Sequence, residues 1–424
     1  MIVLFFLGCH SESVPTYAKD IAPIINGRCI NCHQDGGIGG FDFSDPETVR
    51  QLAPLIAHQV ESGAMPPWPA VDVVSYDNDW SLTSQQIALV VAWANGGTPM
   101  GDLSSLAAPI PSVGGGLSRT DTTLSMSLPY GPTPGSGDDY RCFVLDWNAE
   151  ESTNITGFNA RPGNAAIVHH IAAFLVRPDG LLGESVFDQI QEWEEADTEP
   201  GYPCFGGPAG PGAEVQVPIE QLAQWVPGNQ GIDFPEGTGI TIDPGSKIIL
   251  QLHYYAAPGI SNTSDRTEID LRLDDEVERP AAYSPYLNGL WPLGNMEIPS
   301  GEDSVSHIVS SDPRPFFSLL NDTIDLEHGF VIHDAMLHMH RLGRSGYLNL
   351  IKSNGDEYPI LHVDSWDFDW QFSYRLNEPL IFEDGDSLSL ECVFDNSGED
   401  SIDVNWGEGT EDEMCVGNLY ISTP

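Results

Sequence analysis

The stretch AAIVHHIAAFLVR, residues 165–177, decides the fold class of this chain. It is a short apolar run with polar interruptions, and turn residues of the types Gly, Pro and Asn flank it on both sides. Runs of the same kind recur nearby, as RCFVLDW (141–147), KIILQLHYY (247–255) and EIDLRL (268–273). This repetition of short strands and turns is typical of antiparallel β-sandwiches.

A second block of the same texture starts near residue 283. It contains GFVIHDAMLHMH (329–340), YLNLI (347–351), SLSLECVF (387–394) and GNLYIS (417–422). The break DDEVERPAAYSP (274–285) is the expected boundary, so we predict two β domains, at 121–280 and 283–424. A stretch rich in Pro, Gly and Ser at 99–120 reads as the linker before them.

Residues 14–98 have a different pattern, which predicts a small all-α module. AKDIAPIINGRC (18–29) has apolar residues at helical spacing, and SLTSQQIALVVAWANGG (81–97) combines an N-cap residue, an apolar face and a double-glycine stop. The predicted fold class is therefore mainly β, with two antiparallel β domains preceded by a small all-α domain.

The balance of charge limits the possible partners. The chain has 424 residues, 16 of them basic and 63 acidic, for a formal net charge of −47. Such a surface repels a phosphate backbone, so nucleic acid is excluded as a partner. We interpret the acidic residues as a solvated surface; calcium binding by some acidic clusters is the alternative, without loop-like ligand spacing to favour it.

The N-terminal segment 1–13 begins MIVLFFLGC and resembles the end of a bacterial lipoprotein signal, in which a cysteine after a small residue is lipidated. Cys9 is the candidate. The segment lacks a basic region and its apolar run is short, as in a truncated start. We expect an exported protein, periplasmic or on the outer surface, with possible membrane anchoring through a lipid on Cys9. No later stretch is long enough to span a bilayer.

Seven cysteines divide into three groups. Cys9 belongs to the signal, and Cys29 and Cys32 form a motif of their own. The remaining four are even in number and sit in a chain that we expect to be exported, so disulfides are their predicted use, with three possible connectivities. Buried free thiols are the alternative. The four are Cys142, Cys204, Cys392 and Cys415.

Cys29-Ile30-Asn31-Cys32-His33 is a C-x-x-C-H motif, which predicts covalent haem c. The two thiols can add to haem vinyl groups, and His33 then lies under the iron as an axial ligand. Met65, in SGAMPPWP, is the expected sixth ligand, with Met100 as an outside candidate. Residues 14–98 resemble class I c-type cytochromes. A redox-active or zinc-binding C-x-x-C is the alternative, but no second cysteine pair completes a zinc site.

Five histidines and one methionine form two sets of three candidate metal ligands. Neutral imidazole suits copper, and a thioether added to two imidazoles favours Cu(I). Three protein ligands leave a position open for water, dioxygen or substrate. The sets are His169, His170 and His253, and His338, His340 and Met414.

Strand geometry tests these sets. His338 and His340 are two apart, so both face the same side of a strand. His169 and His170 are adjacent, and an ideal strand would point them to opposite faces. Both can bind one ion only from a bulge or through different ring nitrogens. Buried histidines held by hydrogen bonds are the alternative for any one residue. We interpret the six histidines outside these motifs as surface or satisfied core residues: His10, His58, His307, His328, His333 and His362.

IVHHIAAF, QLHYY, LHMHRLG and DEMC, with YRCFVLD and CVFDNS, resemble the copper type II, ascorbate-dependent monooxygenases over roughly residues 121–424. These include the peptidylglycine α-hydroxylating and dopamine β-monooxygenases. The resemblance implies two jelly-roll-like antiparallel β-sandwich domains facing each other across a cleft. It implies an electron-storage copper on the first ligand set and an oxygen-binding, catalytic copper on the second. It also implies the disulfides Cys392–Cys415 and Cys142–Cys204.

The chain departs from that family pattern in three places. The peptidylglycine enzymes carry an arginine two residues before the H-x-H pair, where this chain has Met336. The asparagine and tyrosine that follow the methionine ligand are displaced here to Asn418 and Tyr420. Peptidylglycine is therefore a poor guess for the substrate. The third departure is the haem module, which suggests that electrons reach copper through haem and not directly from ascorbate.

These observations together predict an oxidoreductase: a monooxygenase with two copper ions and one covalently bound haem c. It would hydroxylate a C–H bond of a small organic substrate with O2, with an electron-donor protein or ascorbate as the reductant. The alternative is a non-enzymatic haem and copper protein that transfers electrons or binds copper.

Overall fold

The computed structural model describes residues 14–110, 116–135, 137–178, 183–204, 207–211, 220–257, 260–321, 323–407, 409 and 411–424. The predicted signal segment 1–13, with Cys9 and His10, lies outside the described residues. The chain divides into two compact units. Unit 1 consists of Met1–Trp68 and Trp80–Val113, and unit 2 of Pro69–Asp79 and Gly114–Pro424.

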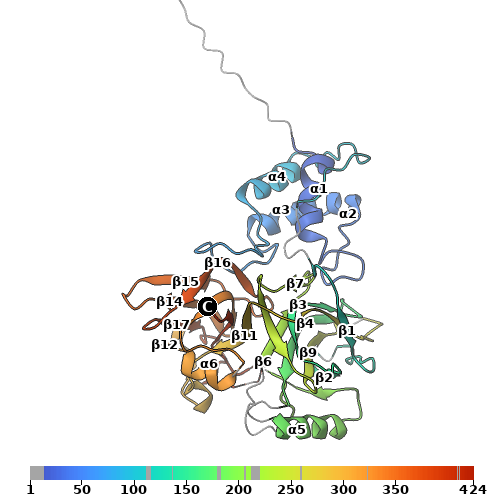
Figure 1. The fold of residues 1–424 in the computed structure, drawn as a ribbon. Helices are drawn as coiled ribbons and strands as arrows, with labels where there is room; N and C mark the ends of the chain where they lie inside the picture. The colour runs from blue at the N-terminus through green and yellow to red at the C-terminus, as the bar shows by residue number, and fades with distance from the viewer. Residues whose placement is uncertain are drawn as a thin grey trace, which may run out of the picture. The chain divides into compact units, whose positions relative to one another are not determined.

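Unit 1 is helical, as the sequence predicts (Figure 1). Its last helix starts at a capping box, in which Thr83 and Gln86 exchange side-chain and backbone hydrogen bonds, and it ends before Gly97, whose φ is +84°. Trp93 and Ile21 are fully buried in its core. The helical segments are η1 (Tyr17–Ile21), α1 (Ala22–Ile24), η2 (Ile25–Cys29), α2 (Pro46–Gln51), α3 (Ala53–Glu61) and α4 (Ser84–Asn95).

The first part of the expected linker is packed against unit 1. Backbone amides of Tyr17 and Ala18 donate to the carbonyls of Pro99 and Met100, and Ala107 donates back to Ala18. The Trp93 indole also donates to the Pro99 carbonyl, at 3.1 Å. Residues 99–110 therefore belong to the helical unit, because the turn residues that suggested a linker also allow the chain to fold back.

The first part of unit 2, which we call the N-half, contains a five-stranded sheet with the order β5-β2-β9-β4-β6. Alternate residues of β9, among them Ile248, Leu250 and Leu252, enter the main core, so His253 lies on the opposite face. Helix α5 (Gly183–Ala196) packs near that face through Ile190, beside Ile249 and Tyr202. The strands are β1 (Thr122–Ser125), β2 (Asp138–Asp146), β3 (Thr153–Arg161), β4 (Val168–Val176), β5 (Tyr202–Pro203), β6 (Glu220–Trp225), β7 (Ile232–Asp233), β8 (Thr238–Ile242), β9 (Lys247–Tyr255) and β10 (Glu268–Asp274).

The remainder, the C-half, contains a four-stranded sheet with the order β12-β17-β14-β15. Two short helical segments, η3 (Trp291–Leu293) and α6 (Arg314–Leu320), connect its strands. The strands are β11 (Arg279–Tyr286), β12 (Val305–Ser311), β13 (Phe330–His338), β14 (Gly343–Ile351), β15 (Glu357–Val363), β16 (Tyr374–Phe382), β17 (Ser387–Phe394) and β18 (Val416–Ser422).

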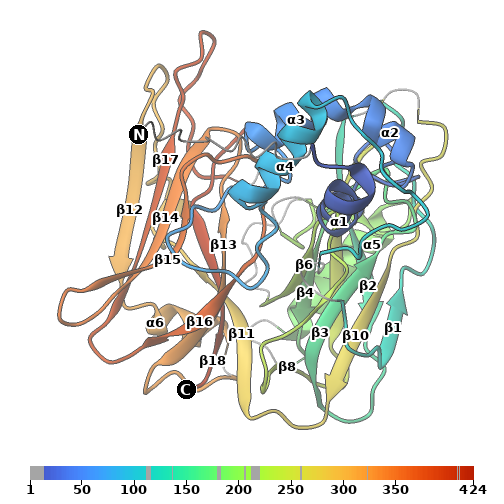
Figure 2. The ribbon, with the colours of Figure 1, turned by 90° about the horizontal axis from the view of Figure 1, so that it is seen from above.

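A nine-stranded sheet runs through both halves, in the order β1-β10-β3-β8-β11-β18-β13-β16 with β7 beside β3. Strand β11 joins the halves: it runs parallel to β8 at Arg279 and Pro280 and antiparallel to β18 along its length. Figure 2 shows β11 and β18 between the strands of the two halves. The mainly β class is confirmed, but the sequence placed a domain boundary where the structure has a shared sheet.

Residues 69–79 also differ from the expectation that they belong to the helical module. They cross the C-half as isolated bridges, Ala70 with Val363 and Tyr76 with Leu376. The Tyr76 hydroxyl donates to the Ile360 carbonyl at 3.1 Å. A segment with no strand periodicity of its own thus belongs to unit 2.

Candidate metal centres

A β-bulge brings His169 and His170 to the same face of the five-stranded sheet. Val168 pairs with Tyr254 and His170 pairs with His253, so His169 is the extra residue of β4. A bulge adds one residue to a strand and breaks its alternation. This is one of the two ways in which adjacent histidines can share a metal ion.

The three imidazoles converge. One ring nitrogen from each of His169, His170 and His253 lies within 4.8 Å of the other two. The Nδ1 atoms of His253 and His170 are 3.3 Å apart. Nitrogens bound to one ion at about 2 Å lie about 3–4 Å from each other, so small side-chain rotations would complete a three-nitrogen site.

Two neighbours orient His253. Its Nε2–H donates to Asp138 Oδ1 at 2.9 Å, which leaves the Nδ1 lone pair for a metal. The Tyr140 ring is stacked on His253, with centroids 4.2 Å apart and planes at 4°. Asp138 and Tyr140 both lie on β2, whose Tyr140 pairs directly with His253.

Burial favours the neutral form of two of these histidines, His169 and His170. It lowers the pKa of His169, and His253 lowers it further, against the opposing effect of nearby aspartates. The pKa of His170 is lowered well below its ordinary value, again by burial first and then by His253, His169 and His338. Neutral imidazole is the form that binds a metal.

His338 and His340 form the second group, at the end of β13. Their ring centroids are 5.1 Å apart. His338 Nδ1 donates to Gln371 Oε1 at 2.6 Å, and His340 Nδ1 donates to the Asp412 carbonyl at 3.0 Å. Each neutral ring therefore carries its lone pair on Nε2. Burial, and then His340, lower the pKa of His338 to about 4.

The segment before β18 brings Met414 toward these histidines. Val416, two residues later, pairs with His338, and Met414 itself is 4% exposed. The carboxylate of Glu413 joins the two segments, because it accepts from the amides of His340 at 2.8 Å and Leu342 at 2.5 Å. Burial raises the pKa of Glu413 to about 7, although these amides favour the carboxylate.

The four remaining cysteines form two disulfides, so the predicted use of these residues is confirmed. One is Cys142–Cys204, between β2 and the segment after β5. The other is Cys392–Cys415, which ties β17 to the residue after Met414.

The two histidine groups lie near each other within unit 2. His338 contributes to the lowered pKa of His170, and Asp367 and Asp369 oppose the lowering at His169. Gln224 on β6 donates to the Gln371 carbonyl at 2.8 Å, which joins the halves beside His338. Arg341, next to His340, lies 3.4 Å from Asp138 Oδ2.

In unit 1 the C-x-x-C-H residues fit a covalent haem better than a redox dithiol. Cys29 and Cys32 are not joined to each other. Burial raises the pKa of Cys29 to about 12 and that of Cys32 to about 11, whereas a redox-active thiol needs a lowered pKa. His33 stacks on Phe43 at 4.3 Å, and a Cβ at Gly39 would overlap Nδ1 of His33, so Nε2 is the nitrogen suited to iron. Met65 is 37% exposed, on the segment after α3.

Sequence reasoning missed three residues that hold the histidine groups in place: Asp138, Gln371 and Glu413. Glu413 could have been found from the sequence, because it directly precedes the candidate ligand Met414. Asp138 is two residues before Tyr140 and so shares its face, which could have suggested a contact with the partner strand. Gln371 comes from an irregular segment, 367–373, and the sequence has no periodicity there to place it.

The structure describes five of the other six histidines. His307 and His362 bond to Glu297 and Asn349, and His58 and His328 are exposed. His333 is buried on β13, with one nitrogen bonded to Ser422.

The structure has no helix, among the residues it describes, of the length and apolar character needed to cross a membrane.

Residues 319–422 match the family model for the copper type II ascorbate-dependent monooxygenase, C-terminal domain. Tyramine beta-hydroxylase from Caenorhabditis briggsae is 23% identical over 61% of this chain and 40% of its own length. DBH-like monooxygenase protein 2 from Mus musculus is 26% identical over 60% of this chain and 38% of its own length. The chain thus spans about two fifths of these curated relatives. Among solved structures, the major capsid protein P2 from Bacteriophage PM2 covers 71% of this chain and 97% of its own, at 7% identity and a TM-score of 0.25, too low to carry an argument.

Proposed function

We propose that this chain, which the comparisons relate to the copper type II ascorbate-dependent monooxygenases, hydroxylates a C–H bond of a small organic substrate. In the overall reaction, substrate, O2, two electrons and two protons give an alcohol and water. The observation that carries the proposal is the convergence of His169, His170 and His253, made possible by the bulge at His169, with a second histidine pair nearby. Copper bound at both groups supplies electron storage at one and oxygen activation at the other.

The residues of each group suit their proposed roles. His169, His170 and His253 present three converging imidazoles, and Asp138 holds His253 with Nδ1 toward the other two. This all-nitrogen set is the proposed electron-storage site. His338, His340 and Met414 add a soft thioether, which stabilises the reduced metal that meets oxygen. Gln371 and the Asp412 carbonyl direct both Nε2 atoms of this catalytic set.

The proposed electron supply is haem c in unit 1, held covalently by Cys29 and Cys32 with His33 and Met65 on the iron. The two separate protonated thiols and the orientation of His33 support this assignment. An electron-donor protein or ascorbate would reduce the haem, which would then reduce the three-histidine site.

The residues at positions 336 and 418 limit which substrate we propose; they are Met336 and Asn418. They pair across β13 and β18, two residues before His338. No guanidinium stands at position 336 to hold a substrate carboxylate, which argues against peptidylglycine. The name of the Caenorhabditis relative makes tyramine a reasonable first compound to test.

We also propose an oxidising location outside the cytoplasm, periplasmic or on the outer surface. Two disulfides in unit 2 support it. Lipid anchoring through Cys9 is part of the same proposal and is testable by mass spectrometry of the N-terminal peptide.

The test is O2 consumption and product formation by the reduced, copper-loaded full chain, with tyramine and other phenyl-substituted amines and alkanes. Met414→Ala and His340→Ala should abolish hydroxylation and leave haem reduction intact. Met296→Ala, at a fully buried methionine, and His362→Gln, outside both groups, are matched controls that should retain turnover. Equal rates in the site variants and the wild type would instead favour a haem and copper electron carrier.

A further inference from the structure

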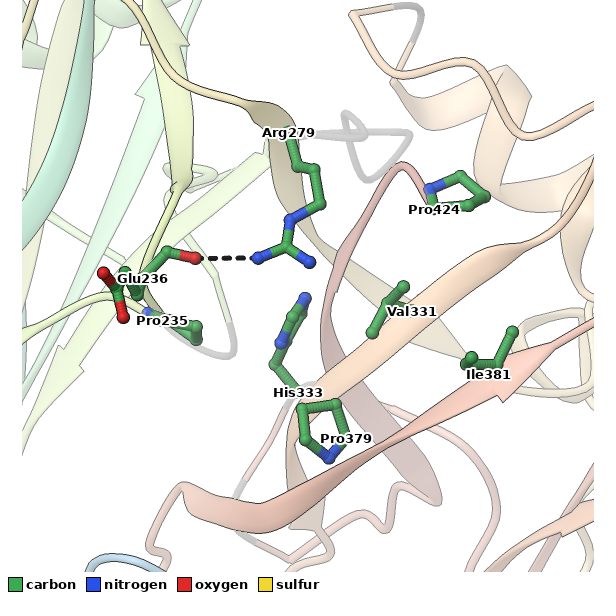
Figure 3. Close-up of a pocket in the computed structure, with 8 residues that line it drawn as sticks. All are labelled: Pro235, Glu236, Arg279, Val331, His333, Pro379, Ile381 and Pro424. Atoms are coloured by element: carbon green, nitrogen blue, oxygen red, sulfur yellow. Dashed lines mark hydrogen bonds between the residues drawn. The ribbon is translucent and has the colours of Figure 1, made fainter.

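A pocket of about 450 Å³ opens on the shared sheet, where β8, β11, β13 and β16 meet. Its size lies within the ~300–1,000 Å³ of small-molecule sites. Val331, Ile381, Pro235 and Pro379 form apolar walls, and Arg279 and His333 supply polar groups (Figure 3). His333 and His338 are five residues apart on β13, roughly 17 Å at strand rise. The pocket is therefore separate from the proposed copper sites.

His333 lines this pocket and has a buried acceptor atom without a partner. It is the bulge residue of β13 and is 3% exposed. Its Nε2 lies 2.9 Å from Ser422 Oγ. The Ser422 hydroxyl donates its only hydrogen to the Thr423 carbonyl, also at 2.9 Å, so it can only accept from His333. The His333 Nε2–H is thus the donor, and Nδ1 keeps a lone pair that is buried without a hydrogen-bond partner. Burial, with Arg279 and Arg375, lowers the pKa of His333 to about 4, which keeps the ring neutral.

Arg279 supplies the positive charge. One terminal nitrogen donates to the Glu236 carbonyl at 2.8 Å, and Nε is buried with no partner. Figure 3 shows the guanidinium and the His333 ring directed toward one another, with the Glu236 carboxylate turned away. A buried polar atom without a partner has a free-energy cost that a suitable ligand removes.

We propose that this pocket binds a small α-hydroxy carboxylate with an apolar body. The carboxylate would accept from Arg279, and the adjacent hydroxyl would donate to His333 Nδ1. The apolar remainder would lie against Val331, Ile381 and the prolines. A metal cation is disfavoured beside the guanidinium, and a phosphate dianion would find one cation and mostly apolar walls.

Mandelate is the probe, with phenylacetate, which lacks the hydroxyl, and 1-phenyl-1,2-ethanediol, which lacks the carboxylate, as matched ligands. Calorimetric titration of the full chain is done with copper reduced, so that chelation to Cu(II) does not contribute. Mandelate should bind at least tenfold more tightly than either analogue. Arg279→Gln should weaken mandelate binding at least tenfold, and His333→Gln should remove the preference for mandelate over phenylacetate.

Arg266→Gln is the control, because Arg266 donates to the Met126 carbonyl in the N-half, away from the pocket, and it should bind mandelate like the wild type. If the pocket variants do not fold, the ¹⁵N signal of His333 Nδ1 in the wild-type chain gives a second test and should shift with mandelate. Equal affinity for the three ligands, wild-type binding by Arg279→Gln, or an unmoved His333 signal under saturating mandelate would overturn the proposal.

Discussion

Asp138 bonds to both His253 and Arg341: its Oδ1 lies 2.9 Å from His253 Nε2, and its Oδ2 lies 3.4 Å from Arg341, the neighbour of His340. A carboxylate behind a metal-binding histidine fixes the ring and raises its basicity, and its loss weakens metal binding about 10–100-fold. We expect Asp138→Ala to weaken copper binding at the three-histidine site by that factor, and Asp138→Asn by less. Copper titration followed by EPR measures this.

Asp139→Ala is the matched control for Asp138, because the Asp139 carboxylate accepts from Tyr130. It should leave the copper affinity of the three-histidine site unchanged. Equal affinities of Asp138→Ala and the wild type would show that Asp138 does not position His253.

Gln371 should have the same role for the second group. Its Oε1 accepts from His338 Nδ1, and its own Nε2 donates to the Phe368 carbonyl, which fixes the amide. Gln371→Leu removes the acceptor that keeps the proton of His338 on Nδ1 and leaves Nε2 to bind a metal. Copper binding at His338 and His340 should therefore weaken about tenfold or more. The His362–Asn349 pair has the same chemistry outside both groups, and Asn349→Leu should leave copper binding intact. If Gln371→Leu and Asn349→Leu weaken copper binding equally, the cause is a general folding defect and not the loss of the Gln371 acceptor.

Glu413 should stabilise the fold as well as the ligand geometry. Its buried carboxylate accepts from the amides of His340 and Leu342. Each buried donor left without a partner costs about 1–3 kcal/mol. Glu413→Ala should therefore lower the free energy of unfolding by at least about 2 kcal/mol in urea titration. The side chain of neighbouring Glu411 is 89% exposed, so Glu411→Ala should change the free energy of unfolding little. A Glu413→Ala chain as stable as the wild type would refute this role.

Asp334 predicts a specific pH dependence. Burial raises its pKa to about 6 from an ordinary 3.8, against the opposing effects of Arg375 and Ser373. The folded state then holds the proton more tightly than the unfolded one. The stabilisation from Asp334 is complete below pH 3.8 and is lost as pH rises through about 6. From pH 7 to pH 5, the wild type should gain about 1 kcal/mol relative to Asp334→Asn.

Urea unfolding of the two chains at both pH values tests this prediction. The difference between them removes the contributions of other titrating groups. Asp400→Asn, at an exposed position, should follow the wild type. Parallel pH dependence of the wild type and Asp334→Asn would contradict the buried, raised pKa.

The spacing of the histidines in the sequence predicted the local geometry of the first group, but it could not predict the residues that hold the groups in place. Two adjacent histidines require a bulge or different ring nitrogens, and β4 has the bulge at His169. The shared sheet could not be predicted, since its joining contacts are between the backbones of β8 and β11, with no side-chain pattern to mark them. Residues 69–79 were misplaced for a related reason: isolated bridges at Ala70 and Tyr76 leave no periodicity.

Copper content is the most direct measure of the central claim that two separate three-ligand sites exist. The full wild-type chain, loaded and desalted, should carry two copper ions, and His253→Ala and His340→Ala should each carry one, with different EPR signals remaining. Equal copper content in all three chains, or no stoichiometric copper in the wild type, would contradict the account.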